Sequence, residues 1–275
     1  MKYSLIAVDI DGTLLNDRSE LSGENRKAID ALSQKGIAVV PVTGRTYYEI
    51  PEAVRKCESI RFFVYSNGAC IFDREQGTVY SSTIPCETAA DIFSLLDSYE
   101  TYTEVYSAGY PWADGAKLNA ECFDYYGISR RFQKIIEKSR KTVSDFSSEL
   151  KSESLKPELF NSFFRSEKDR DECREKLYEH FPDIEAVSSL GLNLEIMNEG
   201  TNKGTGLLKL CDIIKTDPAK VIAIGDNDND IRLFEIAGMR CAVSNACEKL
   251  KAMATEIICS NNEHVIDYVE KNILC

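Results

Sequence analysis

Apolar runs and amphipathic periodicity alternate at the start of the chain. Leu5 to Val8 is a short apolar run, which is typical of a buried strand. From Ser22 to Gly36 apolar residues recur at helical spacing, with Ser22 suited to the N-cap and Gly36 to the C-terminal stop. A second apolar run, Ile37 to Val42, follows at once. Strand, helix and strand over this distance predict a βαβ unit with parallel strands and a right-handed crossover.

The same alternation resumes in the last third of the chain and predicts a doubly wound α/β fold. Between the two ends, Phe62 to Ser66 reads as a strand, and Asn67-Gly68 predicts a tight hairpin into Ala69 to Phe72. The further predicted strands are Leu192 to Met197, Val221 to Ile224, Cys241 to Val243 and Glu256 to Ile258. The predicted helices begin at Lys203, Ile231, Cys247 and Val265.

The pattern changes near Ile84. A helix is predicted over Glu87 to Tyr99, followed by aromatic β-rich segments, a polar and flexible-looking stretch from Ser139 to Ser154, and a helix over Glu167 to His180. We therefore predict that residues 84–190 form an inserted second domain, and that residues 1–83 and 191–275 form the core domain.

Composition excludes several classes of function. The 275 residues carry a formal net charge of −12, which argues against a general nucleic-acid binder and against docking on an anionic membrane. Hydrophobic content of 43% with 28% charged residues is typical of a globular protein. A phosphorylated substrate remains compatible with this charge, because a bound metal and a lysine can reverse the field inside a site.

The ten cysteines include no CxxC pair, so a zinc site is not expected. The chain shows no signal-peptide pattern and no apolar run long enough to cross a membrane. We therefore expect a cytoplasmic protein with reduced, mostly buried cysteines. Only two histidines occur, His180 and His264, and neither lies beside a cysteine or serine motif.

Two carboxylates follow the first predicted strand. Asp9 and Asp11 stand at positions i and i+2, so an extended chain would direct both to one side. Anions held that close repel each other unless a cation lies between them, and carboxylate oxygens suit Mg²⁺. On this stretch alone, an acidic turn at a strand end is an equally good reading.

Small, polar or charged residues stand at three other strand ends or helix starts. Thr43-Gly44-Arg45 follows the second predicted strand, Lys203 opens a helix, and an acidic cluster from Asp226 to Asp230 follows Val221 to Ile224. Each segment alone would by default be a loop, a surface lysine or a solvated turn. In open α/β sheets, however, ligands bind at the carboxyl ends of the strands. Every one of these segments lies at such a strand end or at the start of a helix, so they are read together.

Four motifs together resemble the haloacid dehalogenase-like (HAD) hydrolases, and among them the Cof-type, class IIB phosphatases. They are Asp9-Ile10-Asp11-Gly12-Thr13, Thr43-Gly44-Arg45, Asn202-Lys203-Gly204 and Gly225-Asp226-Asn227-Asp228-Asn229-Asp230. The resemblance covers roughly Met1 to Ser82 and Leu192 to Cys275. It implies a Rossmann-like core with a mainly parallel sheet, an inserted α/β cap of the C2B type, and dependence on Mg²⁺.

The resemblance also implies roles for the motif residues. Asp9 would attack phosphorus and Asp11 would act as acid and base. The metal would be held by the side chains of Asp9 and Asp226 and the main-chain carbonyl of Asp11.

The remaining site residues would serve the phosphate. The main chain at Ile10 and the side chain of Asn229 would contact phosphate, Asn229 alternatively a metal-bound water. Thr43 and the amide of Gly44 would donate to phosphoryl oxygens, and Lys203 would neutralise the phosphate and the nucleophile. Asp230 and Arg45 would play supporting parts, with Arg45 either paired to a nearby acid or facing the substrate.

The sequence thus predicts a Mg²⁺-dependent phosphatase of small phosphorylated metabolites, with sugar phosphates as the expected substrates and an aspartyl-phosphate intermediate. The expected protein is a monomer or a weak homo-oligomer. One alternative is a sugar-phosphate phosphomutase, which would return the phosphate to a bound sugar without releasing it. Another is a phospho-accepting regulatory protein, which would leave Asp11 without a role.

Overall fold

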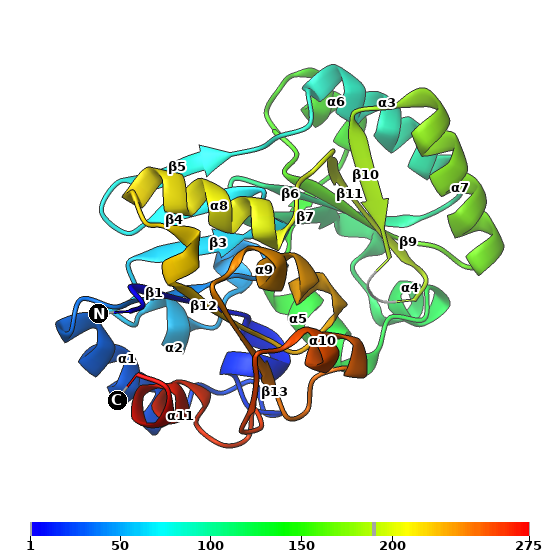
Figure 1. Ribbon diagram of the computed structural model, residues 1–275. Coiled ribbons are helices and arrows are strands. Elements are labelled where there is room, and N and C mark those ends of the chain that lie inside the picture. The colour runs from blue at the N-terminus through cyan, green and yellow to red at the C-terminus, as the bar shows by residue number, and fades with distance from the viewer. Residues whose placement is uncertain (1, 189–190, 275) are drawn as a thin grey trace. The chain divides into compact units, whose positions relative to one another are not determined.

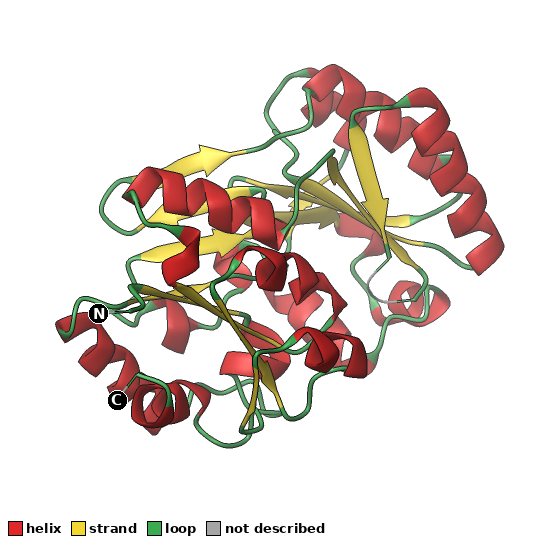
Figure 2. Cartoon of the chain, viewed as in Figure 1, coloured by secondary structure: helices red, strands yellow, loops and turns green. Residues whose placement is uncertain are grey.

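A computed structural model describes residues 2–188 and 191–274, which divide into two compact units. The first unit joins the chain up to Tyr80 to the chain from Asn202 onward, and the second unit spans Ser81–Thr201. Both units combine helices and strands (Figures 1 and 2), as the predicted α/β class requires.

A parallel five-stranded sheet forms the centre of the first unit, in the order β14-β13-β12-β1-β2. Both neighbours of β1 run parallel to it, with Val8 opposite Ile224 on one side and Pro41 on the other. The strands span Leu5–Val8 (β1), Ala38–Pro41 (β2), Val221–Gly225 (β12), Met239–Val243 (β13) and Glu256–Ile258 (β14). The prediction of a βαβ unit at the start of the chain is confirmed.

The described residues of the first unit form six α-helices. They are α1 (Gly23–Gln34), α2 (Glu52–Arg55), α8 (Lys203–Ile214), α9 (Ile231–Ile236), α10 (Glu248–Met253) and α11 (Val265–Asn272). Ser22 is the N-cap of α1, as predicted, because its Oγ accepts a hydrogen bond from the amide of Asn25. Among the helices of the described residues, none combines the length and the apolar character that a membrane span needs.

A small antiparallel sheet, β3-β4-β5, continues the first unit beyond β2. Its strands span Phe62–Tyr65 (β3), Cys70–Asp73 (β4) and Gly77–Ser81 (β5). The predicted hairpin is present, with Tyr65 paired to Cys70 across the turn. A parallel bridge between Val42 and Val64 links this sheet to the chain that leaves β2.

The second unit is built on a six-stranded sheet in the order β10-β11-β9-β6-β7-β8. Its strands span Tyr102–Ser107 (β6), Tyr110–Asp114 (β7), Lys141–Val143 (β8), Leu159–Phe163 (β9), Ile184–Val187 (β10) and Asn193–Asn198 (β11). Its helices span Cys86–Asp97 (α3), Ala120–Tyr125 (α4), Arg130–Ser139 (α5), Phe146–Lys151 (α6) and Glu167–His180 (α7).

The two faces of this sheet pack against different helices. Val105 and Tyr102 lie three residues apart on β6, so their side chains point to opposite faces. Val105 belongs to a core with residues of α3, α6 and α7, whereas Tyr102 packs with Phe123 of α4 and Ile136 of α5. Apolar side chains on both faces are therefore covered by helices.

The boundaries of the second unit differ from the prediction of residues 84–190. The strand predicted at Leu192 to Met197 was assigned to the core, but β11 pairs antiparallel with β9 and β10 of the six-stranded sheet. An apolar strand pattern does not state which sheet the strand joins, and this choice depends on distant partners. The stretch from Ser139 to Ser154, predicted to be flexible, contains the end of α5, then β8 and α6.

Helix α8 approaches the β3–β4 turn at two glycines. A Cβ on Gly206 would lie 2.6 Å from the Cα of Gly68, and a Cβ on Gly68 would lie 2.1 Å from the carbonyl oxygen of Asn202. Gly68 also has a φ of +93°, which side chains rarely adopt. The start of α8, which carries Lys203, can therefore lie against this turn only because both positions lack side chains.

The substitution Gly206→Ala should destabilise the protein. The new methyl group would meet backbone atoms that cannot move aside, and such overpacking costs about 1–3 kcal/mol. Urea unfolding of the full chain measures the loss. The matched control is Gly23→Ala, at the start of α1, where an added Cβ meets nothing within 4 Å. The control should be neutral or more stable by about 0.4–1 kcal/mol, and equal destabilisation by both changes would contradict this account.

Candidate active site

The candidate residues meet at the carboxyl ends of neighbouring strands. Asp9 follows β1 and Asp226 follows β12, and the pairing of Val8 with Ile224 sets these two positions side by side. The amide of Asp9 donates a hydrogen bond to the carbonyl of Ile224, at 2.9 Å. Residues 217 positions apart are thus brought together by the register of two parallel strands.

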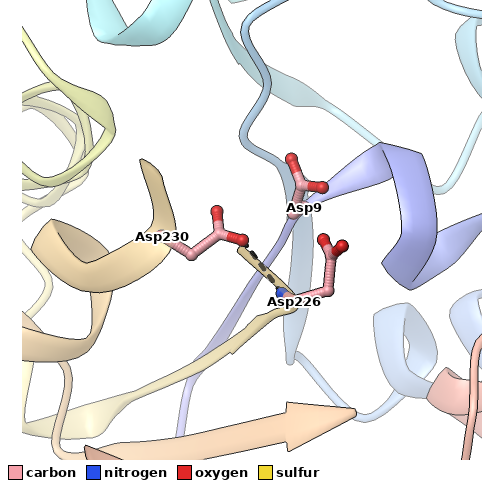
Figure 3. A group of neighbouring side chains, drawn as sticks. All are labelled: Asp9, Asp226 and Asp230. Atoms are coloured by element: carbon pink, nitrogen blue, oxygen red, sulfur yellow. Dashed lines mark hydrogen bonds between the residues drawn. The ribbon is translucent and has the colours of Figure 1, made fainter. Parts of the chain in front are cut away.

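Three carboxylates gather at this edge of the sheet. Oxygen atoms of Asp9, Asp226 and Asp230 lie within 4.8 Å of one another. Figure 3 shows Asp9 on one segment facing Asp226 and Asp230, which both follow β12. Asp9 and Asp230 are buried, and Asp226 is half-buried. Such a group of buried anions is stable only if cations or hydrogen-bond donors offset the charge.

Lys203 supplies one such cation. Its Nζ lies 2.6 Å from Oδ1 of Asp9 and 2.7 Å from Oδ1 of Asp230, and the side chain is only 1% exposed. Burial alone would lower the pKa of Lys203, but the charges of Asp230 and Asp9 raise it above its ordinary value. The lysine is therefore a permanent cation between two of the three carboxylates.

The pKa values of Asp9 and Asp226 are raised mainly by burial and further by the charges of neighbouring carboxylates. Burial raises the pKa of Asp9 well above its usual range; Lys203 opposes this, while Asp230, Asp226 and Asp11 add to it. Burial, with the charge of Asp230, raises the pKa of Asp226 to about 6. One lysine thus compensates the cluster only in part.

Hydrogen bonds fix two of the carboxylates. Oδ1 of Asp230 accepts from Lys203, while Oδ2 accepts from the amides of Asp226 and Asn227, at 3.0 and 3.2 Å. The Thr13 hydroxyl donates to Oδ1 of Asp226 at 3.0 Å. Both oxygens of Asp230 therefore already accept hydrogen bonds. The side chain of Asp226 is oriented by the Thr13 hydroxyl.

The loop after β1 turns so that Asp9 and Asp11 are held by different cations. Arg45 donates from Nε and Nη2 to the two oxygens of Asp11, at 2.6 and 2.7 Å. The expected extended chain is not present at these residues, so whether the two carboxylates point to one side stays a prediction. The extended strand ends at Val8, and the chain then turns through Gly12, whose φ is +77°. Asp11 is accordingly not in the group of three carboxylates.

The remaining predicted residues lie on the same loops. Thr43 is buried directly after β2, and its hydroxyl oxygen accepts a hydrogen bond from the amide of Arg45 at 3.2 Å. Gly44 is the next residue, and a Cβ there would come within 2.9 Å of Oδ1 of Asn67. Ile10 is buried in the turn after Asp9, and Asn229 is exposed on the loop that carries Asp226 and Asp230.

Two asparagines that the sequence did not predict as site residues, Asn245 and Asn261, donate hydrogen bonds to the loop after β1. Asn245 donates to the carbonyl of Gly12 at 2.8 Å, and its Oδ1 accepts from the amide of Asn261 at 3.0 Å. Asn261 also donates to the carbonyl of Leu15. Asn245 follows β13 closely, so the same rule that selected the other strand ends would have found it.

The donor set fits a divalent cation. The carboxylate oxygens are hard ligands of the kind that Mg²⁺ takes, and their charge exceeds what Lys203 offsets. A Cβ on Gly12 would lie 2.6 Å from Oδ2 of Asp226, so the loop approaches this carboxylate as closely as a glycine allows. The carboxylates of Asp9 and Asp226 can therefore hold a metal ion, with Asp230 beside them.

The chain is similar to known proteins along almost its whole length. Residues 6–269 match the family described as haloacid dehalogenase-like hydrolase. The chain is 31% identical to phosphatase YwpJ of Bacillus subtilis, over 98% of this chain and 99% of that protein. It is 29% identical to the 5-amino-6-(5-phospho-D-ribitylamino)uracil phosphatase YwtE of the same bacterium, over 98% and 97%. The solved structure of the HAD subclass IIB sugar phosphatase BT4131 shares the fold, with a TM-score of 0.77, 98% coverage of both chains and 19% identity.

Removing the buried cation should destabilise the protein in a pH-dependent way. Without metal, Lys203→Met leaves Asp9 and Asp230 as uncompensated buried charges, a change that costs about 3–5 kcal/mol at pH 8. The pKa values of Asp9 and Asp226 are raised in the folded state, so protonation at lower pH favours folding and relieves the repulsion. The loss at pH 5 should therefore be smaller.

Urea unfolding in EDTA at both pH values measures the effect. Lys209→Met is the matched control, because Lys209 is exposed on the same helix and lies over the ring of Tyr80. An equal loss of stability at pH 5 and pH 8, or an equal loss in the control, would show that Lys203 does not offset the carboxylates.

Proposed function

This chain belongs to the family of haloacid dehalogenase-like hydrolases, and from that premise we propose that it is a Mg²⁺-dependent phosphatase of small phosphorylated metabolites. It is a phosphoric monoester hydrolase, like the relatives that it matches over almost their whole length. The observation that carries the mechanism is the buried Asp9 carboxylate, which Lys203 holds at 2.6 Å beside Asp226 and Asp230.

In the first half of the reaction, Asp9 is the nucleophile. One of its carboxylate oxygens attacks phosphorus, the bond from phosphorus to the substrate oxygen breaks, and an aspartyl-phosphate forms. Asp11 gives its proton to the departing oxygen, which leaves as an alcohol. Lys203 supports this step because its charge offsets both the carboxylate and the incoming phosphate.

In the second half, water replaces Asp9. Asp11 takes a proton from the water as its oxygen attacks phosphorus, and the bond from phosphorus to the Asp9 oxygen breaks. Inorganic phosphate leaves, the Asp9 carboxylate is restored, and Asp11 is again protonated for the next cycle. This return of the proton is what distinguishes a phosphatase from a protein that stores phosphate on an aspartate.

Groups at neighbouring strand ends would bind the phosphoryl oxygens. The Thr43 hydroxyl accepts a hydrogen bond from the amide of Arg45, which leaves its own hydrogen for an oxygen of the phosphate. The amides of Ile10 and Gly44 and the exposed side chain of Asn229 complete the proposed set of donors. All these groups lie on loops of the first unit.

We assign the metal to the carboxylates of Asp9 and Asp226 and the main-chain carbonyl of Asp11. The two oxygens of Asp230 already accept from Lys203 and from two amides, so Asp230 acts as a support for Lys203 and for the loop of Asp226. When bound, Mg²⁺ would neutralise charge on the phosphate and hold it beside the nucleophile.

We propose sugar phosphates as substrates, and the second unit as the cap of this enzyme. The relative YwtE is named for a phosphorylated ribitylamino pyrimidine, so this compound belongs in the same test. A phosphomutase or a phosphate-storing regulator would release little free phosphate, and phosphate release therefore distinguishes these alternatives from a phosphatase.

Loss of the nucleophile should abolish turnover. Asp9→Asn is expected to lower kcat for phosphate release about 10³-fold or more, because no aspartyl-phosphate can form. The assay follows inorganic phosphate from a panel of phosphorylated metabolites, with Mg²⁺ and with EDTA. Asp212→Asn, an exposed residue of α8, removes the same charge and should keep full activity. Undiminished activity of Asp9→Asn would end the proposed mechanism.

Metal binding should weaken as the pH falls. The folded-state pKa of Asp226 is about 6, above the ordinary 3.8, so below about pH 6 the metal-free carboxyl holds a proton that the cation must displace. For one competing proton, the apparent affinity for Mg²⁺ should fall about tenfold between pH 7.5 and pH 5. The rise in melting temperature on adding MgCl₂ should shrink accordingly.

Thermal unfolding with and without MgCl₂ at the two pH values measures this competition. Asp226→Asn should show almost no rise at either pH, because it lacks the ligand. A rise that is equal at pH 5 and pH 7.5, or that survives in Asp226→Asn, would argue against Asp226 as the ligand.

A further inference from the structure

Arg45 and Asp11 form a two-bond pair across neighbouring loops. The Nε and Nη2 atoms of Arg45 lie 2.6 and 2.7 Å from the two carboxylate oxygens of Asp11. Because β1 and β2 are adjacent parallel strands, the loops that follow them lie side by side and bring these two residues together. A planar guanidinium matches a carboxylate in both distance and direction, so this pair fixes orientation as well as position.

The guanidinium is itself held in place. The third nitrogen, Nη1, donates to the carbonyl of Glu49 at 2.8 Å. The Glu49 carboxylate accepts from the amide and hydroxyl of Thr46, at 3.2 and 3.0 Å, which closes the turn between Arg45 and Glu49. The carbonyl of Arg45 also accepts from the amide of Ser66. Arg45 therefore presents its charge to Asp11 from a backbone that is anchored at both ends.

The two carboxylates of the loop after β1 have separate cationic partners. Asp9 is held by Lys203 of α8, whereas Asp11 is held by Arg45. Asp11 also lies outside the group formed by Asp9, Asp226 and Asp230. The cation that accompanies the acid–base residue is thus different from the one that accompanies the nucleophile.

We propose that Arg45 is the positioning residue of Asp11, and that it affects the reaction only through the direction in which it holds this carboxylate. The inference rests on the proposed function, in which Asp11 moves the proton. A carboxylate offers about four lone-pair sites, of which the arginine takes two, so a proton can still be carried on the remaining side. Proton transfer needs the donor within hydrogen-bond reach of the leaving oxygen, and an unrestrained Asp11 would meet this condition only part of the time.

This role differs from a direct contact between Arg45 and the phosphate. A residue that binds phosphate contributes whether or not Asp11 is present. A residue that acts through Asp11 contributes nothing once the Asp11 carboxylate is gone. The two roles also differ with the leaving group: an alkoxide needs a proton as it departs, whereas 4-nitrophenolate, a far weaker base, leaves without one.

The experiment is a double-mutant cycle on the full-length enzyme with two substrates. Arg45→Ala, Asp11→Asn and the double variant are assayed with 4-nitrophenyl phosphate and with the alkyl phosphate that the metabolite panel identifies. Arg45→Lys is included, because lysine keeps the charge but cannot form the two-bond pair. Arg55→Ala is the matched control, since Arg55 lies over the rings of Tyr47 and Tyr48 and donates to the carbonyl of Ile50.

For the alkyl phosphate, Arg45→Ala should lower kcat/KM about 10- to 100-fold, because kcat/KM reports the steps up to the aspartyl-phosphate, in which the leaving oxygen needs its proton. For 4-nitrophenyl phosphate the loss should stay within about threefold, and Arg45→Lys should fall between the wild type and Arg45→Ala on the alkyl substrate. The double variant should match Asp11→Asn within about twofold, because Arg45 has no carboxylate left to position. Arg55→Ala should not distinguish the two substrates.

Two results would overturn the inference. A further tenfold loss in the double variant would show that Arg45 acts without Asp11, and equal losses in kcat/KM with both substrates would show a structural or phosphate-binding role. Melting temperatures of all variants separate loss of fold from loss of positioning. Asp9→Asn, run in parallel, keeps the two proposals apart: its activity would overturn the proposed function, whereas an inactive Asp9→Asn with an additive cycle would overturn the role of Arg45 alone.

Discussion

The repulsion among three buried or half-buried carboxylates is the constraint on which the first unit depends. Asp9, Asp226 and Asp230 lie within 4.8 Å of one another, and Lys203 is the cation that contacts two of them. In a medium of low dielectric constant such charges repel strongly, and burial already disfavours each of them. The protein tolerates this arrangement because donors are placed on it from three separate segments: a hydroxyl from the loop after β1, two amides from the loop after β12, and the lysine from α8. The pKa values of Asp9 and Asp226 stay raised, so Lys203 offsets the cluster only in part, and the proposed divalent cation would offset the rest.

Glycines allow the segments around the site to pack closely against one another. Gly12 lies against Asp226, and Gly68 and Gly206 let the start of α8 approach the β3–β4 turn. A larger residue at any of these positions would separate the segments that the charges hold together. Packing and electrostatics are therefore not separate contributions here, because Lys203 can reach Asp9 only if α8 begins where the two glycines allow it.

The loop after β1 divides its two acidic residues between two cations. Asp9 remains with Lys203 inside the cluster, and Asp11 is turned to Arg45 on the loop after β2. In the proposed mechanism this separation means that the nucleophile and the proton carrier do not compete for one cation. The parallel order β12-β1-β2 allows the two aspartates to have different partners, because the loops after β12 and β2 lie on either side of the loop after β1.

The sequence by itself determined the class of fold, and it selected the strand ends and the candidate site residues that the structure brings to one edge of the sheet. Apolar runs that end in Asp9, Thr43 and Asp226 state locally where strands stop, and parallel strands necessarily gather their carboxyl ends at one edge. Only the tertiary structure decided the partners. The sequence could not place Asn193–Asn198, because an apolar strand pairs with whichever edge its surroundings offer, and here that edge belongs to the second unit. Nor could it choose between an acid and the substrate as the partner of Arg45, or connect Asn245 to the loop of Gly12. These contacts depend on the path that each loop takes after its strand ends, and the spacing of residues along the sequence carries no information about that path.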